Sequence, residues 1–199
     1  MVRLVLAFLA GVLCVCTCAH ADPILAIDVP AAYTPGSPFD VTVCLTGAED
    51  LALYNIEVVV SAGGGVAGTD FYFVSAVEPA SRYVFDGQAN DGFAYNILGS
   101  ATDHITLSDL LVSGSVDTVA GVNDIVATVT ITTTATMTEP LTVGVVEDHL
   151  ELDAPGGPIL GFDALMAALP APTIPIPEPV ALSLLAIGAV GLLRRGRGR

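Results

Sequence analysis

Few residues in this chain have the type and spacing that catalysis or metal binding requires. His104 and His149 lie in the middle of the chain, and neither has a second ligand at a metal-binding spacing. The chain has no lysine, which excludes a lysine-containing phosphate loop, and it has no Gly-x-Ser-x-Gly nucleophile motif. A glycosidase pair cannot be singled out among 21 acidic residues. We therefore predict a protein that is not an enzyme and that carries no cofactor.

The best candidate for metal binding is the acidic segment Asp86–Gly92. Its residues Asp86, Asn90 and Asp91 offer the carboxylate and amide oxygens that Ca²⁺ prefers. The segment departs from the standard Ca²⁺ loop, because Asp91 stands at the sixth position, which needs glycine, and Ile97 at the twelfth, which needs glutamate. We expect a polar turn between two strands and keep irregular Ca²⁺ binding by these residues as the alternative.

These candidates lie in a stretch, residues 22–169, where apolar and polar residues alternate. Alternation, as in Phe39–Leu45, is typical of a strand with one face in a core. The predicted strands are Ile24–Asp28, Phe39–Leu45, Leu51–Ser61, Phe71–Val77, Arg82–Phe85, Phe93–Ile97, His104–Val112, Asp124–Thr133, Leu141–Glu147 and His149–Leu152. Phe162–Leu169 could form a closing helix or a further strand. The pattern predicts an all-β fold, an antiparallel β-sandwich or jelly roll of about nine strands.

Three tyrosines in the central part of the chain, Tyr72, Tyr83 and Tyr95, raise the question of sugar binding. Rings lying side by side on an exposed face would form a platform for a polysaccharide, whereas buried rings would stabilise the core. The alternation gives each of these strands both buried and exposed positions, and tryptophan is absent. We favour core packing and keep a carbohydrate-binding module as an alternative function.

The order of strands and turns resembles the cohesin-type, carbohydrate-binding-like β-sandwich. The segments that carry this resemblance are Thr34–Ser37, Phe39–Leu45, the long strand Leu51–Ser61, the late strands Asp124–Thr133, Leu141–Glu147 and His149–Leu152, and the Gly-rich turn Pro155–Pro158. The resemblance implies a cohesin-like fold and, as a further alternative, a module that docks another protein. No residue here matches a known partner interface, and a fold does not fix a function.

Charge is distributed unevenly along the chain. All 21 acidic residues lie between Asp22 and Glu178, and Arg82 is the one lysine or arginine in that range. A body this acidic repels phosphate backbones, so we exclude nucleic acid as a partner.

The amino end has the features of a signal peptide over residues 1–21. Arg3 precedes an apolar stretch that is too short for a comfortable membrane span, and Ala19 and Ala21 fit the small-x-small cleavage rule. Asp22 would then begin the mature chain. The alternative is a lipoprotein acylated on one of the first three cysteines, but the residues before those cysteines do not fit.

Signal-peptide cleavage would leave Cys44 as a single cysteine, which cannot form an internal disulfide. Free cysteines are usually small buried residues, so we expect Cys44 to be a partly buried filler and not a reactive thiol.

The carboxyl end changes abruptly in composition at Pro170. Residues 170–179 are rich in proline, which lacks the amide donor, so we expect an extended stalk that joins no sheet or helix. Residues 180–193 are uncharged and predict a short transmembrane helix. The arginine-rich tail 194–199 would stay in the cytoplasm and stop translocation; its charges are Arg194, Arg195, Arg197 and Arg199.

The last residues, 177–199, closely resemble the PEP-CTERM sorting signal of Gram-negative bacteria. The three parts of that signal occur in order here: the motif Pro177, Glu178 and Pro179, a short apolar segment, and terminal arginines. The resemblance implies recognition by an exosortase, which would cut near the motif. A plain anchor that is never processed is the alternative.

Together these features predict an exported, non-catalytic surface or extracellular-matrix protein. It would be held briefly in the inner membrane and then pass to the cell envelope, the cell surface or the exterior. The ligand of the sandwich, a polysaccharide or another surface protein, is left open by the sequence.

Overall fold

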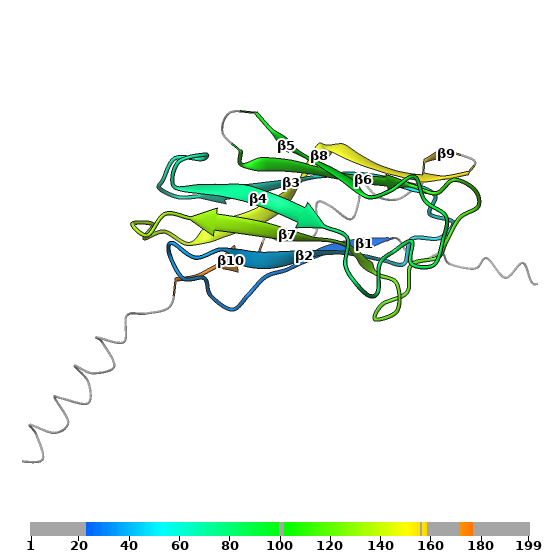
Figure 1. Ribbon diagram of the computed structural model, residues 1–199, viewed down its shortest axis with the longest axis horizontal. Coiled ribbons are helices and arrows are strands. Elements are labelled where there is room, and N and C mark those ends of the chain that lie inside the picture. The colour runs from blue at the N-terminus through cyan, green and yellow to red at the C-terminus, as the bar shows by residue number, and fades with distance from the viewer. Residues whose placement is uncertain (1–22, 100–101, 156, 159–171, 177–199) are drawn as a thin grey trace, which may run out of the picture.

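Two antiparallel β-sheets, packed face to face, form the body of the protein (Figure 1). The computed structural model describes residues 23–99, 102–155, 157–158 and 172–176. The first sheet contains, in spatial order, β1 (Ile24–Asp28), β2 (Phe39–Thr46), β7 (Ile125–Thr133) and β4 (Phe71–Val77). The second contains β10 (Thr173–Ile174), β8 (Leu141–Ala154), β3 (Leu53–Ala62), β6 (His104–Leu110) and β5 (Ala94–Leu98), with β9 (Gly157–Pro158) on the end of β8.

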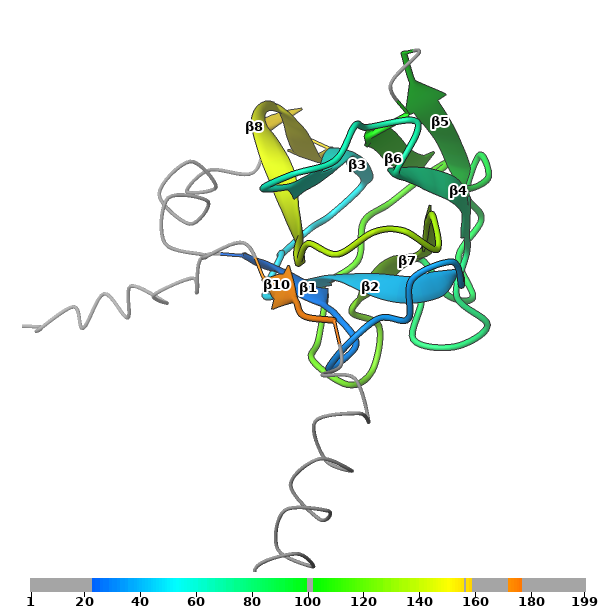
Figure 2. The same cartoon turned by 90° about the vertical axis from the view of Figure 1, so that its left-hand side faces the viewer.

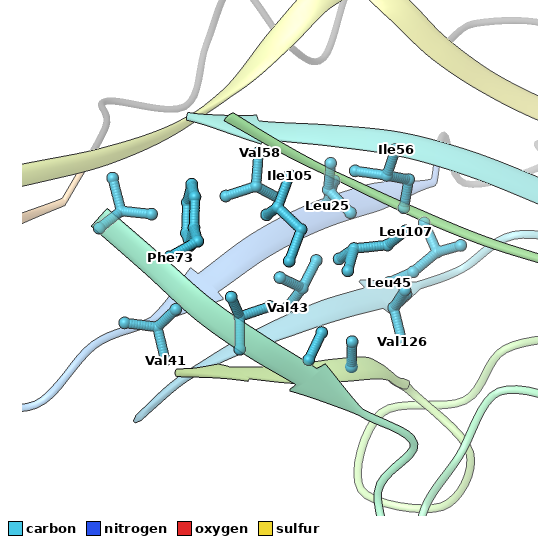
Figure 3. Close-up of a cluster of buried hydrophobic side chains, with 14 of the residues drawn as sticks. Leu25, Val41, Val43, Leu45, Ile56, Val58, Phe73, Ile105, Leu107 and Val126 are labelled. Carbon is cyan, nitrogen blue, oxygen red and sulfur yellow. The ribbon is translucent and has the colours of Figure 1, made fainter. Parts of the chain in front are cut away.

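The core lies between the sheets and follows from the alternation in the sequence. Val41, Val43 and Leu45 of β2 point inward and are at most 1 % exposed. They face the inward residues of the second sheet, among them Ile56 and Ile105 (Figure 3). Burial of such side chains contributes about 1.5–3 kcal/mol each. The predicted all-β sandwich is confirmed.

One predicted strand, Arg82–Phe85, is wrong. Tyr83 makes only a single bridge to Ile125, and the chain then turns, with the Asp86 N–H donating to the Tyr83 carbonyl at 3.0 Å. Arg82 has a φ of 62°, a left-handed conformation that does not continue a strand.

The two strands predicted at Leu141–Glu147 and His149–Leu152 are one strand, β8. Its register against β3 shifts between Ile56, which pairs with Leu150, and Val58, which pairs with Val145. Residues 146–149 therefore lie opposite the single residue Glu57 as a bulge. The irregularity explains why the alternation breaks there although the strand continues.

The prediction that the proline-rich segment joins no sheet is wrong at Thr173–Ile174, which forms β10 on the edge of β8. The flanking prolines contribute only carbonyl acceptors. The Val143 N–H donates to the Pro172 carbonyl at 3.2 Å, and the Tyr33 N–H donates to the Pro175 carbonyl at 3.1 Å. An edge strand tolerates proline because its missing N–H faces away from the sheet.

Several predicted features lie outside the described residues. They are the signal peptide with Ala19 and Ala21, the helix or strand expected at Phe162–Leu169, the motif Pro177–Pro179, the apolar segment 180–193 and the arginine-rich tail. Among the residues that the structure describes, none forms a helix long and apolar enough to cross a membrane.

Candidate functional site

The outer face of the second sheet is a regular surface built by β8, β3, β6 and β5. Its composition follows from strand alternation. Tyr54, Ile56 and Val58 of β3 are buried in the core, so Asn55 and Glu57 between them face outward. This face carries polar and acidic side chains where the core face carries apolar ones.

An open cleft of about 290 Å³ lies at one end of this face, where β3 begins and β6 ends. Its lining residues are Leu53, Tyr54, Asn55, Asp91, Gly92, Ala94, Ser108, Asp109, Leu110 and Glu151. Asn55 pairs with Glu151 across β3 and β8, which places this carboxylate beside the cleft opposite the loop that carries Asp91. The cleft is therefore acidic, and none of the described residues that line it is basic.

A buried hydrogen-bond network forms the floor of the cleft. The Tyr54 and Tyr83 hydroxyls are 2.8 Å apart, and the Tyr83 hydroxyl donates to the Asp109 carboxylate. Asp109 also accepts from Asn90 Nδ2 at 2.6 Å and from the Leu110 N–H at 2.7 Å. Burial is the main reason why the pKa values of Tyr54 and Tyr83 lie above the ordinary tyrosine value. Both hydroxyls consequently remain protonated; Tyr83 donates to Asp109 and Tyr54 contacts Tyr83.

The same network positions the acidic wall of the cleft. Because Asn90 is bonded to Asp109, the next residue is held at the rim, where the Asp91 N–H donates to the Leu110 carbonyl at 2.7 Å. Gly92, with a φ of 108°, completes the turn in a conformation that favours glycine.

The weak Ca²⁺ candidates Asp86, Asn90 and Asp91 have separate roles in the structure. The Asp86 N–H closes a turn onto Tyr83, as expected for a polar connection. Asn90 uses its amide nitrogen on Asp109, and Asp91 lines the cleft. Within the described ranges, no three His, Cys, Asp or Glu residues are grouped so that they could hold a metal ion.

Glu57 and His104 form a pair on the outer face near the middle of the sheet. His104 Nδ1 lies 2.5 Å from Glu57 Oε1. The Glu57 side chain is only 4 % exposed although it faces outward, whereas the His104 side chain is 36 % exposed. The pair therefore presents an imidazole, not a carboxylate, to a molecule lying on this face.

Arg82 is the only lysine or arginine among the described residues, and it is internally paired. Its guanidinium donates two hydrogen bonds to Asp124, at 2.8 and 2.7 Å. Burial opposes ionisation of Asp124, but hydrogen bonds from the Gly121 N–H and from Arg82 hold its pKa below the usual value. The one described guanidinium thus does not offset the charge of the cleft.

The three tyrosines do not form an exposed row. Tyr83 is 2 % exposed and belongs to the core, where its ring lies 6.0 Å from that of Phe85. Tyr72 is half-buried on β4 of the first sheet, and Tyr95 is 44 % exposed on β5 of the second. The favoured prediction of core packing holds for Tyr83 and not for Tyr95.

Cys44 is a buried residue, as the sequence suggests. It is 8 % exposed, and its Sγ lies 3.8 Å from Asp28 Oδ2. Burial, and after it the negative charges of Asp28 and Asp124, raise the pKa of the thiol to about 11. The thiolate is therefore disfavoured at neutral pH, and the residue is a poor nucleophile.

Sequence reasoning singled out Asp91 but missed its partners in the cleft, Asn55, Ser108, Asp109 and Glu151. These residues come from three strands far apart in the chain, and only the pairing register brings them together. Of these partners, only Asp109 could have been noticed in the sequence, because it is a carboxylate at an inward position of the predicted strand His104–Val112.

Comparisons with known proteins identify the fold. No family model matches the chain, and no curated protein matches it. Its structure is similar to that of CaCohA2 from Clostridium acetobutylicum, with a TM-score of 0.52 and 15 % identity over 79 % of this chain and 92 % of that one. For CaCohA2 in its complex with a variant of CaDoc0917, the TM-score is 0.55, with 12 % identity over 77 % of this chain and 99 % of that one.

A third similar structure is the second type II cohesin module of the ScaA scaffoldin of Acetivibrio cellulolyticus. The TM-score is 0.52, with 12 % identity over 70 % of this chain and 90 % of that chain. At this identity the likeness concerns the fold alone. The middle region of the chain is a cohesin-like β-sandwich.

Proposed function

We propose that this protein is an exported, non-catalytic module that docks a partner protein on the outer face of its second sheet. The observation that carries the proposal is the acidic cleft, which opens on a broad sheet face within a cohesin-like fold. CaCohA2, a cohesin of similar fold, has been solved in a complex with a variant of CaDoc0917, and this supports a protein as the kind of partner.

The chemistry of the cleft favours a partner segment with a lysine or arginine next to an aliphatic residue. Asp91 and Glu151 supply negative charge, and no basic residue stands among the described side chains of the lining. Beside them, Leu110 is 43 % exposed and Val112 is 68 % exposed. The Val112 N–H donates to the Ala89 carbonyl, so this apolar rim lies against the loop that carries Asp91. A cationic group would give orientation and an aliphatic group would give contact area.

The test is a binding measurement with matched charge variants of the mature protein. A partner captured from the envelope of the native host is identified by mass spectrometry and then titrated by calorimetry. We expect D91N/E151Q to weaken binding at least about tenfold, because the cationic group loses both of its partners. The control D28N/D40N removes the charges of two exposed residues on β1 and β2 of the first sheet and should change affinity by less than about threefold. Equal losses in both variants would mean that only the overall charge matters, and the cleft would be excluded as the site.

We also propose that the protein is sorted by its C-terminal signal. The supporting observations are the order of Pro177-Glu178-Pro179, the apolar segment and the terminal arginines, together with the predicted signal peptide. An exosortase in the inner membrane would cut near the motif and pass the sandwich to the envelope, the cell surface or the exterior. Mass spectrometry of both termini of the native protein tests this; a mature chain that retains Arg199 contradicts it.

A polysaccharide ligand receives less support. Burial of Tyr83 removes one ring from the platform that such binding would use, and Tyr72 and Tyr95 belong to different sheets. The outer face of the second sheet instead offers carboxylates, amides and hydroxyls. The protein-docking function is therefore the one that the surface favours.

A further inference from the structure

The last described residues, 172–176, form a strap that we call the clasp. On one side it joins the second sheet, where Thr173 and Ile174 pair with Thr142 and Leu141 of β8. On the other side the Pro175 carbonyl accepts from the Tyr33 N–H in the loop between β1 and β2 of the first sheet. The clasp is therefore bonded to both halves of the sandwich; Figure 2 shows β10 below β8, at the level of β1 and β2.

The clasp is part of the core and not a surface addition. Ile174 is 0 % exposed and belongs to the main hydrophobic cluster, against which Ile176 also packs. The loop that receives the clasp is fixed in turn, because the buried Tyr33 donates its hydroxyl to the Glu139 carbonyl at 2.6 Å. The clasp is held by the backbone pairing of Thr173 and Ile174, by the carbonyls of the flanking prolines and by apolar side chains in the core, which explains how a segment rich in proline is held.

The clasp ends immediately before the predicted sorting motif. Ile176 packs on the core, and Pro177 is the next residue. A processing enzyme binds its substrate as an extended chain and needs residues on both sides of the bond that it cuts. In the closed clasp, the residues that precede the motif already use their carbonyls and side chains within the sandwich.

We propose that the clasp gates processing at this motif, an inference that rests on the proposed sorting. In the closed state the residues before Pro177 are withheld from the enzyme, and local opening of residues 172–176 releases them. Cleavage then follows the population of the open clasp. Since the cut falls after Ile176, the clasp remains with the product and can close again, which completes the sandwich after release.

A reversible covalent lock tests the gate. The Val143–Pro172 bond makes Thr142 and Thr173 a non-hydrogen-bonded antiparallel pair, whose Cα atoms lie about 4.5 Å apart, within the range for a disulfide. The variant T142C/T173C is expressed as the full chain in the native host, and the release of residues 177–199 is followed by mass spectrometry. The buried Cys44 does not compete for the bond.

We expect the oxidised variant to be processed at least about tenfold more slowly than wild type, and reduction to restore the rate. The single variant T173C, which cannot form the bond, should be processed normally. In the opposite direction, I174A removes the buried anchor and should speed processing at least about tenfold, whereas T173A changes an exposed side chain of the same strand and should not.

Amide hydrogen exchange reports the clasp without any enzyme. The Tyr33 and Val143 amides, which donate to the clasp, should exchange at least about tenfold faster in I174A, while the core amide of Ile56 should not change. Processing of the oxidised lock at the wild-type rate would overturn the gate and leave the sorting proposal standing. Recovery of the wild-type protein with Arg199 attached would overturn both.

Discussion

Replacing Asp109 with alanine tests whether the buried network beneath the cleft holds its acidic wall. Asp109 is 4 % exposed, and its carboxylate accepts hydrogen bonds from the Tyr83 hydroxyl, Asn90 Nδ2 and the Leu110 N–H. Alanine removes the acceptors of all three donors in one step. The variant should therefore unfold more easily, and it should bind the proposed partner more weakly.

The size of the stability loss in D109A depends on which of the three donors can find another acceptor. The Tyr54 and Tyr83 hydroxyls, 2.8 Å apart, can share only one hydrogen bond, so one of their two protons loses its acceptor, whereas the half-buried Asn90 can reach water. About one buried donor then stays unsatisfied, and the bonds that a charged acceptor makes are lost. The expected loss in the free energy of unfolding is about 2–4 kcal/mol.

Urea denaturation measures this loss, with a constant m-value as the sign that only stability has changed. D109N keeps the size of the side chain and one carbonyl acceptor, so it should lose less than D109A. The double variant Y83F/D109A should lose less than the sum of the single changes, by about 0.5–3 kcal/mol, because the two residues share a bond. A loss below about 1 kcal/mol in D109A, or strict additivity with Y83F, would refute the reasoning.

Two further predictions concern the stability of the sandwich. The hydrogen bonds from Gly121 and Arg82 outweigh burial and lower the pKa of Asp124. Ionised Asp124 therefore stabilises the fold fully above the ordinary aspartate pKa of about 4, and this contribution is lost as the pH falls through the lowered pKa. Thermal melts across that range should show a smaller acid-induced loss in D124N than in wild type, and an equal loss in both would exclude the pair as a cause. Gly36 has a φ of 80° and its added Cβ would lie 3.1 Å from Ala135 Cβ, whereas Gly87 has a φ of 72° and open space around it. G87A should therefore cost about 1–2 kcal/mol, the strain of the left-handed backbone alone, and G36A clearly more; equal losses by urea denaturation would contradict the packing argument.

The sequence predicts the fold where a local pattern decides the structure. The strands Ile24–Asp28 and Phe71–Val77 have the predicted bounds, because alternation and flanking turns define them without reference to a partner. The segment Arg82–Phe85 has equally good strand residues, yet Tyr83 is used for the network with Asp109 and the chain turns instead. Long-range pairing there overrides local preference.

The candidate site is harder to predict for the same reason. Asn55 and Glu151 become neighbours only through the register of β3 and β8, which includes a bulge of several residues. The proline-rich clasp is a second case. Its composition indicates an extended segment, and the structure agrees, but an extended chain with free carbonyls can still occupy a sheet edge. The composition of the clasp predicted its extended conformation but could not predict that it pairs with β8.

The cleft and the clasp lie at opposite ends of one strand. β3 begins at Leu53, which lines the cleft, and ends at Ala62, which pairs with Leu141 beside Ile174 of the clasp. Strands rise about 3.4 Å per residue, so roughly 30 Å of sheet separates the two. Under the proposed sorting, the segment that would anchor the protein in the membrane follows the clasp, and the acidic cleft lies at the other end of the sheet from the clasp.

The distance between the cleft and the clasp also separates the carboxylates of the cleft from the charge of the membrane surface. Any negative charge on the outer surface of the inner membrane acts over about a Debye length, near 8 Å at physiological salt, which is much shorter than the length of β3. The carboxylates Asp91 and Glu151 would therefore remain available to a cationic partner while the protein is still anchored. Docking of a partner and processing of the tail could then proceed independently, since the clasp responds to local opening at one end and the cleft to charge at the other.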